Sequence, residues 1–135
     1  MPATVTQVRA GLTTRLGTIA GLRTSAYPPD QLNPPIGFAV LETIEYHRAM
    51  GGGDVVMRWS VFVIVGRYTD RIAHASLDGY LSYSGATSLR AALEGDRTLG
   101  GVAQTLIVSD ATNISAVSVA ESEFLQVQCT VEVHA

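Results

Sequence analysis

The spacing of apolar residues near the start of the chain predicts an amphipathic helix. The residues that recur at steps of three and four positions are Val5, Val8, Leu12, Leu16 and Ile19. Such a pattern places apolar side chains on one helical stripe. Thr4 and Gln7 have the spacing of a capping box at the helix start. We expect the helix to end at Gly17 or Gly21.

The next segments have the composition of β-strands. Residues 22–27 can form a short strand, and Pro28, Pro29 and Asp30 then begin a stiff surface loop that continues through a second proline pair. Strands are expected from Ile36 to Tyr46 and from Val55 to Arg67. Together these two strands predict a long β-hairpin that projects from the domain.

The second strand of this hairpin changes character along its length. Residues 61–65, VFVIV, are apolar at every position, which is typical of a central strand covered on both faces. In residues 55–60, apolar and polar positions alternate less regularly. We therefore expect Arg58 and Trp59 to lie beyond the core, near the projecting end of the hairpin.

Two further helices are predicted in the middle of the chain. Thr69 or Asp70 begins the first of them, and Thr87 or Ser88 begins a short second one that closes at Gly95. The apolar face of the longer helix is expected to hold Ile72, Ala73, Leu77, Tyr80 and Leu81.

The C-terminal third predicts three more strands, over residues 102–110, 116–120 and 125–133, with a hairpin turn at residues 113–115. In the last strand, one set of alternating residues is apolar: Leu125, Val127, Cys129, Val131 and Val133. The order of elements predicts one α+β domain over residues 1–135. Its sheet is mixed but mostly antiparallel, and the N-terminal helix and two central helices pack on it.

Composition adds two constraints. Apolar residues make up 47% of the chain and charged residues 16%, which favours burial of surface in an oligomer. The net charge is −3 and every cation is arginine, with no basic cluster. This pattern argues against sequence-independent DNA binding and against an anionic membrane partner. With no signal peptide or transmembrane run expected, the protein is predicted to be soluble and cytoplasmic.

The residues that usually carry chemistry do not form a recognisable constellation. His74, Ser76 and Asp78 suggest a hydrolytic trio, but residues two apart on a helix point away from each other. The three histidines lack metal-ligand spacing, and Cys129 reads as a small buried thiol. We therefore expect no enzyme activity, no metal and no cofactor.

The tip of the predicted hairpin is the candidate interaction site. A triple glycine in a phosphate-binding loop would precede a helix and commonly a lysine, and neither feature is present. A glycine-rich tip flanked by aromatic, arginine and methionine side chains is instead typical of a protein interface. The predicted interface residues are Tyr46, His47, Arg48, Met50, Gly51, Gly52, Gly53, Asp54 and Arg58, with Pro28, Pro29 and Asp30 of the proline loop. An idle loop is the alternative.

Four sequence stretches in a fixed order carry a resemblance to a known family. They are GLRTSAYPPDQLNPP, YHRAM with the glycine tip, LDGYLSYSGATSLRAALEGDRTLGG and the terminal VEVHA. From about residue 20 to the end, the chain resembles the tail terminator (tail-completion) proteins of long-tailed, siphovirus-type bacteriophages, especially those of actinobacterial hosts. Departures occur at His47, where the family more often has an acid, and at Ala86, where it more often has proline.

The resemblance implies a structural virion protein of the neck. It implies a homo-oligomeric ring, usually a hexamer, that stops polymerisation of the tail tube protein and offers the surface for the head–tail connector. DNA would pass through the lumen without specific binding, and net acidity suits such a channel. The alternatives are a connector or stopper ring, another minor tail protein of the same virion, and a small ligand-binding domain.

Overall fold

The computed structural model describes residues 4–19, 21–25, 27, 35–46, 55–69, 71–101, 103–119 and 122–134. The elements in chain order are α1 (Val5–Leu16), β1 (Arg23–Ser25), β2 (Ile36–Tyr46), β3 (Val55–Arg67), α2 (Arg71–Leu81), α3 (Leu89–Glu94), β4 (Thr105–Val119) and β5 (Ser122–His134). Five strands form one sheet in the order β1-β2-β3-β5-β4. Only the β1–β2 pair among these neighbours is parallel. The predicted α+β class with a mostly antiparallel sheet is confirmed.

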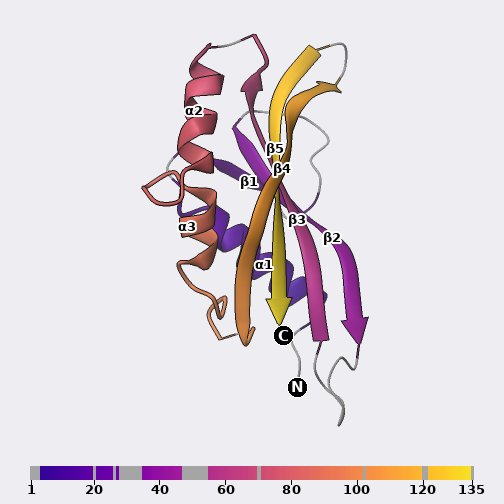
Figure 1. The fold of residues 1–135 in the computed structure, drawn as a ribbon. Coiled ribbons are helices and arrows are strands. Elements are labelled where there is room, and N and C mark those ends of the chain that lie inside the picture. The colour runs from indigo at the N-terminus through magenta and orange to yellow at the C-terminus, as the bar shows by residue number, and fades with distance from the viewer. Residues whose placement is uncertain are drawn as a thin grey trace.

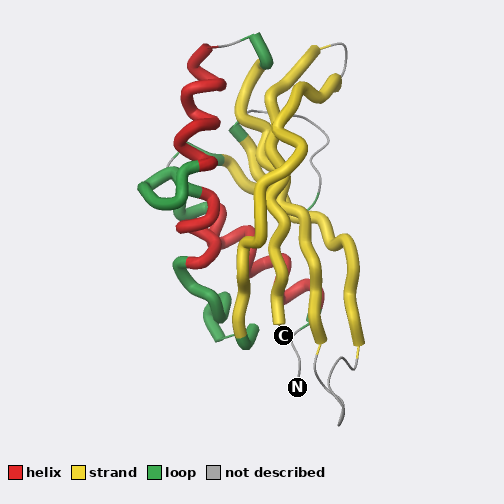
Figure 2. The backbone as a smooth tube through the Cα atoms, in the orientation of Figure 1, coloured by secondary structure: helices red, strands yellow, loops and turns green. Residues whose placement is uncertain are grey.

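The helices all pack on one face of this sheet (Figures 1 and 2). Residues of α1, α2 and α3 share a single hydrophobic cluster with one side of β3 and β5. The fully buried members of the cluster include Val8, Leu12, Leu16, Trp59, Val61, Val63, Leu93, Leu106, Val127, Val131 and Val133. The architecture is therefore two-layered, with helices on one side and an open sheet face on the other.

The helix ends agree with the sequence. The Thr4 side chain accepts a hydrogen bond from Gln7 N, and the Gln7 side chain accepts one from Thr4 N, so both halves of the capping box are present. Gly17 caps the C-terminal end of α1. Ser88 caps α3 by accepting a hydrogen bond from Ala91 N, and Gly95 closes that helix. Side-chain acceptors of this kind satisfy helix N–H groups that lack an intrahelical partner.

The hairpin of β2 and β3 has the predicted strand bounds, and β3 is the central strand. The prediction for Trp59 is wrong, because its side chain is fully buried. Residues 57, 59, 61 and 63 all point to the helix face, and the Arg9 guanidinium from α1 lies 5.0 Å from the Trp59 ring centroid. Regular alternation continues to the Val55 end of this strand, and α1 covers Trp59 on the helix side.

Ile72 is also placed differently from the prediction. Ala73, Leu77 and Tyr80 form the buried stripe of α2, whereas Ile72 is 75% exposed. The reason is a close approach between α2 and β3 at Gly66, where an added Cβ would lie 2.9 Å from the Ala73 Cβ. Only a small residue fits at this contact, so Ala73 faces the sheet and Ile72 turns away.

The C-terminal region forms two strands, whereas three were predicted. β4 runs without interruption through residues 113–115, so these residues do not form a hairpin turn. Its register against β5 shifts between Val108 and Asp110 and again between Thr112 and Ser115. These irregularities absorb extra residues without ending the strand. The alternating apolar set of β5 is buried, as predicted.

Candidate interaction surface

The face of the sheet opposite the helices is the broadest candidate surface, and no described helix or strand packs on it. We call it the open face. Strand alternation determines its membership, since residues of β3 from Val56 to Ile64 face the open side and the helices in turn. Cross-strand pairing then aligns these residues in rows across β2, β3, β5 and β4.

One half of the open face is apolar. Phe38 and Phe62 are cross-strand partners on β2 and β3, with ring centroids 5.6 Å apart and planes inclined by 25°. The next row pairs Ile36 with Ile64, and both of these side chains are buried. Both phenylalanines remain partly exposed. Stacked rings of this kind form an apolar platform of the sort that other proteins cover.

The other half of the open face is polar. Its β5 residues are Gln126, Gln128, Thr130 and Glu132, all partly exposed. Gln128 Nε2 donates a hydrogen bond of 2.7 Å to Ser60 Oγ on β3. Ser60 is nearly buried, and this bond supplies the partner that a buried hydroxyl requires. The polar half is thus ordered by its own hydrogen bonds.

Charges collect at the end of the open face that lies toward the hairpin. Arg58 NH1 lies 3.8 Å from Glu45 Oε1, and Arg58 Nε lies 3.7 Å from Glu132 Oε2. His134 Nε2 lies 2.9 Å from Glu132 Oε1. The Arg58 side chain is 45% exposed, so these pairs hold it in place more than they stabilise the fold.

Two predicted interface residues lie in the described chain. Tyr46, at the end of β2, is 66% exposed, and Arg58 projects from the open face of β3. The other predicted interface residues lie outside the described residues: His47, Arg48, Met50, Gly51, Gly52, Gly53 and Asp54 of the hairpin tip, with Pro28, Pro29 and Asp30. Sequence reasoning missed the open face itself. The polar positions of β5 were visible, but their alignment with Phe38 and Phe62 depends on strand order.

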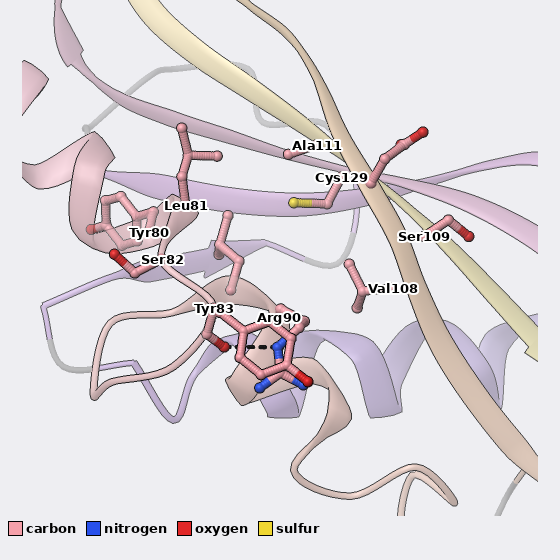
Figure 3. A pocket seen from close by; sticks show the side chains of 11 residues that line it. Tyr80, Leu81, Ser82, Tyr83, Arg90, Val108, Ser109, Ala111 and Cys129 are labelled. Carbon is pink, nitrogen blue, oxygen red and sulfur yellow. Dashed lines mark hydrogen bonds between the residues drawn. The ribbon is translucent and has the colours of Figure 1, made fainter.

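A separate pocket of about 300 Å³ lies between the helices and β4 (Figure 3). Tyr80 and Leu89 line its helix side, and Val108, Ala111 and Cys129 line its strand side. At its rim, the Arg90 guanidinium stacks 3.7 Å from the Tyr83 ring centroid, and Arg90 Nε donates a 2.7 Å hydrogen bond to Tyr83 O. Most of the inner lining is apolar.

The Cys129 thiol in this pocket is poorly suited to nucleophilic chemistry. Burial, with a smaller contribution from the Asp110 carboxylate, raises the pKa of Cys129 to about 11. Only about one thiol in a thousand would be ionised at pH 8, and the thiolate is the reactive form. The pocket therefore offers space for an apolar group more readily than a reactive centre.

His74, whose trio with Ser76 and Asp78 was rejected from the sequence, lies on α2 and contacts Tyr68. His74 Nε2 lies 2.6 Å from the backbone oxygen of Tyr68, and the His74 ring meets the Tyr68 ring edge-on at 5.2 Å. Among the described residues, no group of three or more His, Cys, Asp or Glu side chains could hold a metal ion. In the described part of the chain, no helix combines the length and apolar character needed to cross a lipid bilayer.

Comparison of the whole chain with protein-family models and with curated proteins yields no match.

Proposed function

We propose that the protein is a ring-forming structural subunit of a phage virion, of the tail terminator type. In this proposal, copies join around a hollow axis at the head-proximal end of the tail tube. The ring stops tube polymerisation and provides a joining surface for the head–tail connector. The resemblance of the sequence to tail terminators supplies the virion context, and the open face supplies the physical basis.

The observation that carries the proposal is the open face, with the Phe38–Phe62 stack on one half and hydrogen-bonded polar residues on the other. We assign this face to contact with the end of the tail tube. An apolar platform bordered by polar and charged groups is the usual anatomy of a protein interface. Arg58 continues this face toward the hairpin tip, whereas the exposed Tyr46 pairs with Val55 and lies on the helix side of the sheet.

The ring itself follows from heterologous contacts, in which one patch of each copy meets a different patch on the next. When the rotation between copies closes, such contacts build a ring and leave no free end. A closed ring on a tube end explains why growth of the tube would stop. The net charge of −3 is compatible with a lumen that DNA crosses without sticking, and neutralising its acids should slow DNA passage.

Electron microscopy of tail tubes tests the proposal directly. Purified protein is mixed with uncapped tubes from the phage that carries it, and we expect a ring on one end of each tube and no further growth. Binding to the connector but not to tubes would favour the stopper-ring alternative. Monomeric protein that binds neither, but takes up a small apolar ligand in the pocket beside β4, would favour a ligand-binding domain.

Deletion of Gly51, Gly52 and Gly53 tests the predicted role of the hairpin tip. We expect the subunit to remain folded but to cap tubes less completely, because a shortened tip cannot order against its partner. The matched control is the variant Gly51→Ser/Gly53→Ser, which keeps the length and polar character and should cap normally. If the deletion variant caps tail tubes normally and supports infectivity, the proposed role of the tip is wrong.

A further inference from the structure

We propose that neighbouring copies in the ring join through their sheet edges, with β4 of one copy pairing antiparallel to β1 of the next and Asp110 lying opposite Arg23. This inference rests on the proposed ring and specifies how its lateral contact is made. It assigns the open face and the strand edges to different partners. The open face meets the tube, and the two edges meet other copies.

The first argument is the state of the two edges. β4 is an edge strand of 15 residues, and β1 is the opposite edge. One outward N–H of β4 is already covered, since Val108 N donates a 2.9 Å hydrogen bond to Glu94 Oε2 of α3. Beyond that point, no described strand pairs with the outer side of β4. A long open edge is a ready template for an added strand.

The second argument is strand direction. β1 and β2 are parallel, and each later step across the sheet, from β2 to β3, β5 and β4, is antiparallel. β4 therefore runs opposite to β1 of its own copy. Rotation about a ring axis preserves strand direction relative to the axis and the radius. β1 of the next copy thus meets β4 antiparallel, which is the stronger form of pairing.

The third argument is charge. Asp110 is the single charged residue in the β4 sequence, and Arg23 is the single charged residue in the β1 sequence. Asp110 pairs through Thr130 with Ser60, and Arg23 pairs through Ile36 with Ile64. Both therefore lie on the open face, at opposite edges. Opposite charges facing across adjacent strands favour pairing, whereas like charges oppose it.

The pocket beside β4 gives room for the added strand. Val108 and Ala111 of β4 line its strand side, on the helix side of the sheet (Figure 3). Thr24 alternates with Arg23 and Ser25, so it points to the helix side in β1. In the proposed register, Thr24 of the next copy would lie against this pocket while Arg23 reaches Asp110 on the other face.

Disulfide trapping tests the geometry. In Arg23→Cys/Asp110→Cys, every copy can link to the next, so mild oxidation of the assembled protein should give a ladder of covalent oligomers on a non-reducing gel. The unaltered protein is the control, because its buried Cys129 should remain reduced. If Asp110→Cys alone gives covalent dimers, two β4 edges pair with each other and the proposal is overturned. Absence of the ladder at every concentration also overturns it.

Charge reversal tests the energetics through the concentration at which copies associate, measured by sedimentation velocity. We expect Asp110→Arg and Arg23→Asp each to raise the midpoint by about fivefold, from the loss of one pair and the gain of repulsion. The double variant Asp110→Arg/Arg23→Asp should return the association midpoint to that of the unaltered protein. Asp78→Arg makes the same charge change on an exposed position of α2 and should leave it unchanged. Unchanged association in both single variants would contradict the pairing.

These results separate the inference from the proposed function. Rings that cap tubes without forming the Arg23→Cys/Asp110→Cys ladder would remove the edge pairing and leave the terminator proposal standing. A ladder in protein that never binds tube ends would support the edge pairing and contradict the terminator proposal. Persistent monomers, even with tubes present, would overturn both.

Discussion

At the scale of single residues, Glu94 connects α3 to the edge of the sheet. Its carboxylate accepts hydrogen bonds from Val108 N at 2.9 Å, Arg90 NH1 at 2.8 Å and Arg97 NH2 at 3.3 Å. Burial by itself would raise the pKa of this carboxyl. The hydrogen bonds from Val108 and Arg90, with the charges of Arg90 and Arg97, outweigh burial and lower the pKa below its ordinary value.

Glu94→Gln should therefore destabilise the fold by about 1–2 kcal/mol at pH 7, because the charge-assisted hydrogen bonds are lost. A pKa that is lower in the folded state stabilises the protein fully above the ordinary carboxyl pKa, and that stabilisation is lost as pH falls through the lowered value. The difference from the unaltered protein should thus shrink in acid. Urea unfolding at several pH values, followed by the single tryptophan, measures it. Glu42→Gln, at an exposed position of β2, should have little effect.

At the scale of elements, the contact of α2 with β3 depends on the absence of a side chain at Gly66. This residue follows a register shift in β3, and an added Cβ there would lie 2.9 Å from the Ala73 Cβ. Gly37 in β2 is different, since an added Cβ would meet Leu16, Leu22 and Val63 at an ordinary 3.5 Å. The two strand glycines therefore have different structural roles.

Gly66→Ala should cost about 1–3 kcal/mol of folding stability, because overpacking must push α2 from the sheet. Gly37→Ala is the matched control and should be neutral or slightly stabilising, since the new methyl fills space and restricts the unfolded chain. Thermal unfolding of both variants checks this difference. Equal stability of the two would show that α2 moves without cost.

At the scale of the whole molecule, the helices cover only one face of the sheet, and the two faces have separate roles. The helix face holds the core and determines whether the chain folds. The open face and the sheet edges are the surfaces available to partners. Substitutions on the open face should therefore change assembly more than they change folding.

Phe62→Thr should leave the subunit folded, at a cost of about 1 kcal/mol from the lost ring pair, and should weaken capping of tail tubes. Association between copies should not change, since β3 lies away from both edges. Micrographs of tube ends and sedimentation velocity measure the two effects separately. Ile72→Thr removes an exposed apolar group from α2 and should alter neither. Normal capping by the Phe62 variant would contradict the assignment of the open face.

The sequence by itself determined the features that depend on neighbouring residues. One capping box, single cap residues and apolar steps located the helices. Period-two alternation located the buried side of β5, and Tyr46 and Val55 were predicted as the strand ends next to the glycine tip. Each of these is a local pattern, because the helix and strand periods arise from backbone geometry within a few residues. The sequence also showed no residues at the spacing of a known catalytic site. The absence of enzyme activity stays a prediction.

Only the tertiary structure decided which surfaces those elements bury or expose. Trp59 is buried because α1 returns over β3, and Ile72 is exposed because Gly66 and Ala73 set the rotation of α2. Residues 113–115 continue a strand because β5 pairs with β4 on both sides of the irregularity, at Thr112 and again at Ser115. The open face and the Arg23 and Asp110 edges depend on strand order, which joins residues far apart in sequence. No short-range periodicity contains that information, because the same strands could pair in another order with each local pattern unchanged.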